Sequence, residues 1–151
     1  MKPLKASFFA LIAAAAVGIA NAGDYLTDFE AAKKKAEADK KPLLVKFTGS
    51  DWCPPCIKLN DEVFSKSSFK KAVEKDFVVV VLDFPRKKKL PEEESAANKK
   101  VAKEYDLKSY PTVMLMDSKG KVFKSMSGYA GGGVEAYLKG LKKSLRARKF
   151  K

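Results

Sequence analysis

Asp51-Trp52-Cys53-Pro54-Pro55-Cys56 is the stretch that decides how the rest of the chain is interpreted. It contains both cysteines and the only tryptophan of the 151 residues. An apolar run at 42–48 precedes it. Pro54 suits the first position of a helix, because the N–H that proline lacks would be unsatisfied there. The sequence therefore predicts a buried strand, a turn at 48–51, and a helix that starts directly after Cys53.

The two cysteines have unequal positions for disulfide exchange. The thiolate is the nucleophile in this reaction. A cysteine just before the first helical turn lies at the positive end of the helix dipole, which lowers its pKa. Cys53 has this position, and Cys56 lies on the same helical face one turn deeper. We therefore expect Cys53 to be the more exposed thiol. Cys56 can then attack a mixed disulfide formed at Cys53 and release the reduced substrate.

Three other interpretations of the cysteine pair compete with this one. A structural disulfide that closes a loop of four residues would contribute only about 2 kcal/mol in the chain-entropy model. A zinc site needs four ligands, and the chain has no histidine and no further cysteine. Two inert buried thiols fit poorly with the flanking turn and prolines. We favour a redox-active dithiol, with no metal and no bound cofactor.

The residues between the cysteines indicate the direction of the reaction. Pro54 and Pro55 remove two N–H donors that would otherwise face the Cys53 sulfur, and no histidine is present to stabilise a thiolate. Both features favour a less oxidising couple, whereas a nearby Lys46 ammonium would act in the opposite sense. We predict a thiol–disulfide oxidoreductase that reduces or isomerises protein disulfides. A disulfide-forming oxidase, and a redox-gated binding or holdase module without turnover, stay as alternatives.

The N-terminus has the pattern of a secretory signal peptide. Two lysines within the first five residues precede an apolar run at 7–20, and Ala20-Asn21-Ala22 supplies an A-x-A cleavage site. The run is shorter than the ~20 apolar residues of a membrane-spanning helix, which disfavours an uncleaved anchor. We expect a signal peptide at 1–22, a single mature domain at 23–151, and a periplasmic or secreted location.

The remaining pattern alternates helices and strands. Helices are predicted at 24–41, 54–64, 69–75, 95–105 and 134–148, and strands at 43–47, 77–82, 112–116 and 121–127. Leu26 and Ile57 are placed on the inner faces of the first two helices, with Thr27 or Asp28 as the first cap. The β-branched run at 77–82 indicates a central strand buried on both faces. Alternation of strands with helices indicates parallel pairing, and a final hairpin adds an antiparallel edge.

The composition limits the classes of partner. There are 31 Lys and Arg against 18 Asp and Glu, a net charge of +13, with lysine spread over most of the chain. A dispersed basic surface gives solubility and diffuse attraction to anions. The sequence has no basic groove pattern with interleaved aromatic residues, so nothing in it indicates a specific nucleic-acid site. The segment at 84–94, with Arg86 to Lys89 followed by three glutamates, is interpreted as a solvated insertion rather than a docking site. We expect a monomer.

Three separate stretches resemble the thioredoxin superfamily: 47–56, Tyr110-Pro111-Thr112, and Gly128 before the last helix. The chain is similar to secreted bacterial thioredoxin-like proteins and to the periplasmic thioredoxin domain of membrane thiol reductases. The resemblance implies an α/β fold, a three-layer sandwich with a central mixed sheet of about four strands between helices. It also implies that Cys53 attacks, that Cys56 resolves, and that Pro111 is a cis-proline facing the pair.

The same resemblance implies how clients bind and how the dithiol is reduced again after each reaction. Client proteins with disulfides would contact the surface around the motif, which consists of Trp52, Pro54, Pro55, Tyr110 and Pro111. Tyr110 would offer its backbone to an extended client segment. A membrane thiol reductase would donate the electrons.

One position departs from the family pattern. The strand before the motif usually carries an aspartate that accepts the proton of the resolving cysteine, and strand alignment puts Lys46 there. A lysine accepts that proton only if its own pKa is strongly lowered. Asp51, Asp61 and Glu62 are the other candidates for the proton path. The alternation of Lys46 with its apolar neighbours equally fits a side chain that points to solvent.

Overall fold

The computed structural model describes residues 25–148, so the expected signal peptide lies outside the described residues. The elements in chain order are α1 (Phe29–Asp39), β1 (Leu43–Thr48), α2 (Pro54–Leu59), the π-helix η1 (Asn60–Phe64), α3 (Ser67–Asp76), β2 (Val78–Asp83), α4 (Glu92–Glu104), β3 (Thr112–Met116), β4 (Val122–Ser127) and α5 (Gly133–Arg148). None of the helices within residues 25–148 combines the length and the apolar character that a bilayer span requires.

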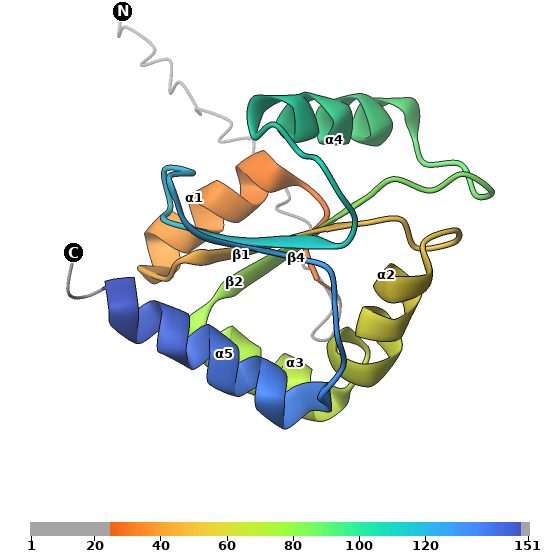
Figure 1. Ribbon diagram of the computed structural model, residues 1–151. Coiled ribbons are helices and arrows are strands. Elements are labelled where there is room, and N and C mark those ends of the chain that lie inside the picture. Colours follow the sequence, from red (N-terminus) through yellow and green to blue (C-terminus); the bar gives the residue numbers. More distant parts are fainter. Residues whose placement is uncertain (1–24, 149–151) are drawn as a thin grey trace, which may run out of the picture.

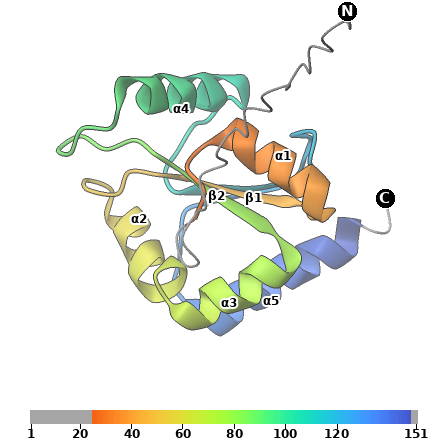
Figure 2. The same cartoon turned by 180° about the vertical axis from the view of Figure 1, so that it is seen from behind.

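The strands form one mixed sheet in the order β2-β1-β3-β4. β1 pairs in parallel with β2 and antiparallel with β3, and β4 pairs antiparallel with β3. Helices α1 and α4 cover one face of the sheet, and α2, α3 and α5 cover the other (Figures 1 and 2). Each face has its own apolar core. The predicted three-layer α/β sandwich is confirmed.

β1 is a central strand, and all six of its residues are buried. Side chains alternate between the two faces of a strand. Val45 and Phe47 join the core beneath α1, while Leu44 joins the core on the face covered by α2 and α5. Lys46 has the same parity as Leu44 and therefore points to the α2 face. The redox motif follows β1 directly, so this strand positions the cysteines.

The prediction of a central strand at 77–82 is wrong. The β-branched run forms β2, which lies at the edge of the sheet. Its residues are still mostly buried, because they belong to the cores on both faces of the sheet, and the segment before α1 covers its outer edge. Val81 N–H donates to the Leu26 carbonyl at 2.8 Å, and Leu26 N–H donates to the Val79 carbonyl at 3.3 Å. Leu26 is therefore bridged to β2 rather than helical. α1 begins at Phe29, after the N-cap Asp28.

The prediction that β3 pairs in parallel is also wrong. After α4 ends, residues 105–111 turn back, so β3 begins at the end of the sheet where β1 terminates (Figure 1). A helix between two strands does not force parallel pairing when an extended segment follows it in this way. Thr112 consequently pairs with Phe47 in an antiparallel register. This arrangement brings the Tyr110-Pro111 segment to the same end of the sheet as Cys53.

Besides α1, two helices differ clearly from prediction at their boundaries. α4 begins at Glu92 rather than Ser95, so the three glutamates fill its first turn, where negative charge is favourable near a helix N-terminus. The helix predicted at 54–64 is divided into α2 and the π-helical turn η1. π-helical turns occur often at functional sites, and this one directly follows the cysteine pair.

Candidate active site

Cys53 and Cys56 lie at the start of α2 and form a disulfide, with their Cα atoms 5.2 Å apart. Cys53 is the N-cap residue, with an extended backbone (φ −101°, ψ 104°), and two prolines open the helix. Cys53 is 3% exposed and Cys56 is 0% exposed. The predicted order of exposure is confirmed, although the difference is small in this oxidised form.

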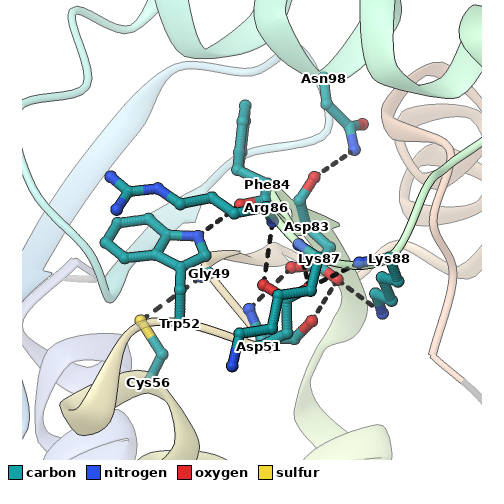
Figure 3. Close-up of polar contacts among 11 residues, drawn as sticks. Gly49, Asp51, Trp52, Cys56, Asp83, Phe84, Arg86, Lys87, Lys88 and Asn98 are labelled. Atoms are coloured by element: carbon teal, nitrogen blue, oxygen red, sulfur yellow. Dashed lines mark hydrogen bonds and ion pairs between the residues drawn. The ribbon is translucent and has the colours of Figure 1, made fainter.

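Gly49 connects both cysteines to the end of β1. Its N–H donates to the Cys56 sulfur at 3.5 Å (Figure 3), and its carbonyl accepts from the Cys53 N–H at 3.1 Å. A Cβ atom at this position would lie 2.4 Å from Cε2 of the Trp52 indole. Glycine is therefore required by the close approach of the tryptophan ring.

The Trp52 indole belongs to a group of packed aromatic rings beside the cysteines. Its Nε1–H donates to the Phe84 carbonyl at 2.7 Å, and the Arg86 guanidinium lies 3.7 Å from its ring centroid. Tyr110 packs edge-on against Trp52, with centroids 5.7 Å apart, and also packs against Phe84 at 5.3 Å. The Tyr110–Pro111 peptide bond is cis, as the resemblance implies.

The outer surface of α2 beside the cysteines is apolar. Pro54, Pro55 and Ile57 are exposed, and Ile57 is 40% exposed. The predicted inner position of Ile57 is wrong, because the buried positions of α2 are Cys56 and Leu59. These two residues are three apart and define an inner face from which Ile57 is turned away. Cys53 is thus flanked by apolar groups that a client could contact.

Asp51 binds the basic loop to the redox motif. Its carboxylate accepts the backbone N–H groups of Arg86, Lys87 and Lys88 at 2.9, 2.8 and 2.9 Å (Figure 3). These hydrogen bonds, led by the one from Arg86, lower the pKa of Asp51 to about 2. The side chains of residues 86–89 are exposed, as a solvated insertion predicts. The backbone of the loop, however, is fixed to the residue two positions before Cys53.

Lys46 is buried, at 2% exposure, on the face of the sheet that α2 covers. The alternative that it points to solvent is wrong, because β1 is central and helices cover both of its faces. Its Nζ lies 4.3 Å from the centroid of the Phe64 ring. None of the ion pairs between described residues involves Lys46. Together with Cys56, Asp61 and Asp83, it lines a partly open cavity of about 270 Å³.

The charges around this cavity act on Lys46 in opposite directions. Burial lowers the pKa of Lys46 to about 8, and the Asp83 and Asp61 carboxylates oppose that shift. Asp83 is itself bound by other groups. It accepts from the Ser50 N–H at 3.0 Å, from the Ser50 hydroxyl at 2.6 Å and from the Lys88 ammonium at 2.8 Å. Burial alone would raise the pKa of Asp83, yet these contacts hold it below its ordinary value.

The structure brings two of the four predicted proton-path residues to Cys56. Lys46 and Asp61 line its cavity. Asp51 instead binds the 86–88 loop, and Glu62 accepts a hydrogen bond from the Tyr129 hydroxyl at 2.7 Å. Within residues 25–148, no three metal-ligating side chains are grouped as a metal site would require.

Sequence reasoning missed Asp83 and its neighbours. Asp83 ends the β-branched run and pairs in register with Thr48, the last residue of β1. The carboxyl ends of parallel strands lie at the same end of a sheet. The acidic residue at the end of the buried run was therefore the signal that could have placed Asp83 near the redox motif. The Asn98 side chain, 2% exposed on α4, donates to the Asp83 carbonyl at 3.0 Å and fixes this corner.

A family profile described as the thioredoxin-like domain matches residues 29–142. The chain therefore belongs to the thioredoxin-like family, and the resemblance drawn from the motif and from Tyr110-Pro111 is confirmed. With Cys53 and Cys56 joined at the start of α2, the protein is a thioredoxin-like thiol–disulfide oxidoreductase.

Two curated relatives come from Chlamydia pneumoniae. The chain is 35% identical over 117 residues to the disulfide bond reductase DsbH, across 78% of this chain and 70% of that protein. It is 30% identical over 89 residues to the thioredoxin-related protein DsbJ, across 59% of this chain and 26% of that protein.

Solved structures give the same picture. A DsbH oxidoreductase structure matches with a TM-score of 0.74 and 32% identity, across 83% of this chain and 88% of that one. A thioredoxin from Thermus thermophilus matches with a TM-score of 0.57 and 21% identity, across 80% of this chain and 86% of that one, and shares the fold.

Proposed function

We propose that this protein reduces disulfides of client proteins in the periplasm, and isomerises them when a client leaves with a rearranged disulfide. The observation that carries the proposal is the asymmetric pair itself: Cys53 is the N-cap of α2, and Cys56 is buried behind it. The 35% identity to a protein named a disulfide bond reductase supports the reducing direction.

The reaction would begin from the reduced dithiol. The Cys53 thiolate attacks one sulfur of a client disulfide, a bond forms between Cys53 Sγ and that sulfur, and the other client sulfur leaves as a thiolate. The partial positive charge at the start of α2 stabilises the Cys53 thiolate before attack. The client is then attached to Cys53 by a mixed disulfide.

Cys56 completes the reaction. Its thiolate attacks Cys53 Sγ, the bond between Cys53 and the client breaks, and the second client sulfur leaves as a thiolate that takes up a proton. Two electrons have then passed to the client, and the protein is left with the Cys53–Cys56 disulfide that the structure contains. The N–H of Gly49 points at the Cys56 sulfur and stabilises negative charge on it.

The surface around Cys53 suits a client segment that is extended and partly apolar. Pro54, Pro55 and Ile57 are exposed on α2, and the Trp52 and Tyr110 rings pack together on the other side of the motif. We assign to Tyr110 the backbone contact with an extended client strand, a mode of binding that depends little on client sequence. Pro111 directly precedes β3, next to this contact.

Location and electron supply complete the proposal. The positive, apolar, small-residue order at 1–22 is that of a secretory signal peptide, which supports export to the periplasm. A dithiol donor must return two electrons to the Cys53–Cys56 disulfide after each turnover. We assign that role to a membrane thiol reductase, the partner that the family resemblance suggests.

The direction is tested by the reduction potential of the Cys53–Cys56 couple, measured against glutathione, together with an insulin-reduction assay. We expect a potential close to that of thioredoxin, about −270 mV, and reduction of insulin that Cys53→Ser abolishes. A potential near about −120 mV, the range of strong oxidases, would contradict the reductase and favour disulfide formation.

A further inference from the structure

We propose that the amine of Lys46 accepts the proton of the Cys56 thiol as Cys56 attacks the mixed disulfide, an assignment that rests on the proposed function. The two side chains line one cavity, Lys46 from β1 and Cys56 from the buried face of α2. Both are excluded from the outer surface, at 2% and 0% exposure. The cavity therefore gives a proton that leaves Cys56 access to the Lys46 amine.

A lysine at the centre of a buried strand needs an explanation. An unpaired buried ammonium is strongly unfavourable, because it loses its hydration without gaining a counter-charge. The Phe64 ring, 4.3 Å from Nζ, is a much weaker partner than water. The register neighbours of Lys46 are Val81 and Val113, and Leu44 occupies the same face two residues earlier. An apolar residue would therefore suit this position better for stability, which points to a chemical role.

The charged groups around Lys46 leave its amine available as a base. Asp83 faces it from β2 and Asp61 from η1, yet burial outweighs both and gives a pKa of about 8. Lys88, from the loop after β2, is paired with Asp83 at 2.8 Å, and the β3 neighbour Val113 carries no charge. A thiol has an ordinary pKa of about 8.5. An amine whose pKa lies near that range can accept a proton from a thiol.

Asp83 is a poorer acceptor for the same proton. Its carboxylate is already engaged by Ser50 and Lys88, and its pKa lies below the ordinary value. Transfer from a thiol to such a carboxylate would be strongly uphill. Asp61 also lines the cavity, but its side chain is exposed.

The neutral Lys46 amine takes the proton from the Cys56 thiol and becomes an ammonium. The Cys56 sulfur forms its bond with Cys53 Sγ, the bond between Cys53 and the client sulfur breaks, and the client leaves as a thiolate. The ammonium then loses its proton to the departing thiolate or to solvent. When a donor dithiol later attacks Cys53, the amine, protonated again from solvent, can return a proton to the Cys56 thiolate.

A thiol assay with two phases tests this assignment on the mature chain. Reduced protein is mixed with dithiobis-nitrobenzoate, so the first coloured thiolate reports attack by Cys53 and the second reports attack by Cys56. Lys46→Met removes the amine and keeps a similar length and volume. We expect the second phase to slow by about 100-fold near neutral pH, the typical size of a general-base effect. The first phase should change by less than about two-fold, because Cys53 does not depend on Lys46.

The pH profile and two further variants make the outcome decisive. The second-phase rate of the wild type should rise with pH and level off above about pH 8, whereas Lys46→Met should lose that plateau. Lys46→Arg keeps a positive charge that cannot be given up, and it should be as slow as Lys46→Met. Asp39→Asn, at an exposed ion pair on α1 away from the cavity, should stay within about three-fold of wild type.

Two results would overturn the assignment. One is a second-phase rate for Lys46→Met that lies within about two-fold of the wild-type rate and has the same pH profile. The other is a Lys46→Arg rate close to wild type, which would make Lys46 a fixed charge. The proposed function fails separately, if the protein cannot reduce insulin while the second phase still depends on Lys46.

Discussion

The indole of Trp52 lies so close to Gly49 that a Cβ atom on the glycine would stand 2.4 Å from indole Cε2. The same glycine donates its N–H to the Cys56 sulfur and accepts the N–H of Cys53. Trp52 in turn donates to the carbonyl of Phe84, in the loop after β2. Because Gly49 has no side chain, the end of β1, the cysteine pair and the loop after β2 can lie in contact with one another.

Gly49→Ala should displace the Trp52 ring. We expect a loss of about 1–3 kcal/mol in the free energy of unfolding, the usual effect of overpacking. The emission spectrum should also change, because Trp52 is the only tryptophan. Urea denaturation followed by fluorescence measures both. Gly140→Ala is the matched control, since nothing lies within 4 Å of its added Cβ and alanine is a better helix former than glycine. Equal stability and emission for Gly49→Ala and wild type would show that the indole is not held against Gly49.

Lys46→Met should make the protein more stable at neutral pH. Burial lowers the pKa of Lys46 from 10.5 to about 8, which corresponds to about 3 kcal/mol of unfavourable free energy for the charged amine. The folded chain binds fewer protons than the unfolded chain between these two values, so wild-type stability rises with pH across that window. Below about pH 8 the full penalty is present, and above about pH 10.5 it is gone. The advantage of Lys46→Met should therefore shrink as pH rises from about 8.

Urea denaturation of the oxidised proteins at about pH 7 and pH 9.5 measures this difference. A Lys46→Met protein that is less stable than wild type at the lower pH would show that the lysine is a structural residue. Higher stability combined with slow resolution by Cys56 would show that stability is given up at this position for chemistry.

Asp51→Asn should loosen the basic loop. The carboxylate accepts three backbone N–H groups from residues 86–88, and an amide oxygen is a weaker acceptor. The pKa of Asp51 is about 2 in the folded chain against an ordinary value of 3.8. The stabilisation is therefore present above about pH 4 and is lost as pH falls through about 2. Hydrogen exchange of the 86–88 amides should become faster in the variant at neutral pH.

Asp39→Asn is a suitable control for the loop, because Asp39 makes an exposed ion pair with Lys35 on α1. It should leave exchange at 86–88 unchanged. Unchanged exchange in Asp51→Asn as well would mean that other contacts hold the loop, among them the stacking of Arg86 on Trp52.

Ile57→Ser should weaken client binding without changing the dithiol. Ile57 is 40% exposed next to the cysteines, and Val122 is 36% exposed on β4, so Val122→Ser removes similar apolar surface elsewhere. We expect Ile57→Ser to raise KM for a protein client a few-fold and to leave the reaction with dithiobis-nitrobenzoate unchanged. Equal effects of the two substitutions on the protein client would rule out a client contact at Ile57.

The layered fold could be predicted because its signals are local. The apolar run of β1, the prolines after Cys53 and the spacing along α5 each act over a few residues. The position of β2 at the edge could not be predicted, because its β-branched run is buried on both faces like a central strand and Leu26, outside any strand, covers its free edge. The direction of β3 depends on how residues 105–111 turn back, which no short pattern encodes.

The cysteine pair could be recognised from the sequence, but the residues that surround it could not. Lys46 gave two equally good interpretations until the sheet order showed that helices cover both faces of β1. Asp83 and Ser50 meet only because parallel strands end together. Asp51 looked like a candidate for the proton path, but its carboxylate turns outward to the backbone of Arg86, a partner 35 residues away.

The central claim is that Cys53 attacks and Cys56 resolves, and covalent trapping tests it most directly. The full chain, residues 1–151, would be expressed in a Gram-negative bacterium as Cys56→Ser and as Cys53→Ser, and the periplasmic proteins would be separated without reductant. We predict that Cys56→Ser accumulates mixed disulfides with several client proteins, all released by dithiothreitol, and that Cys53→Ser accumulates almost none. Trapping by Cys53→Ser to the same extent, or by neither variant, would contradict the account.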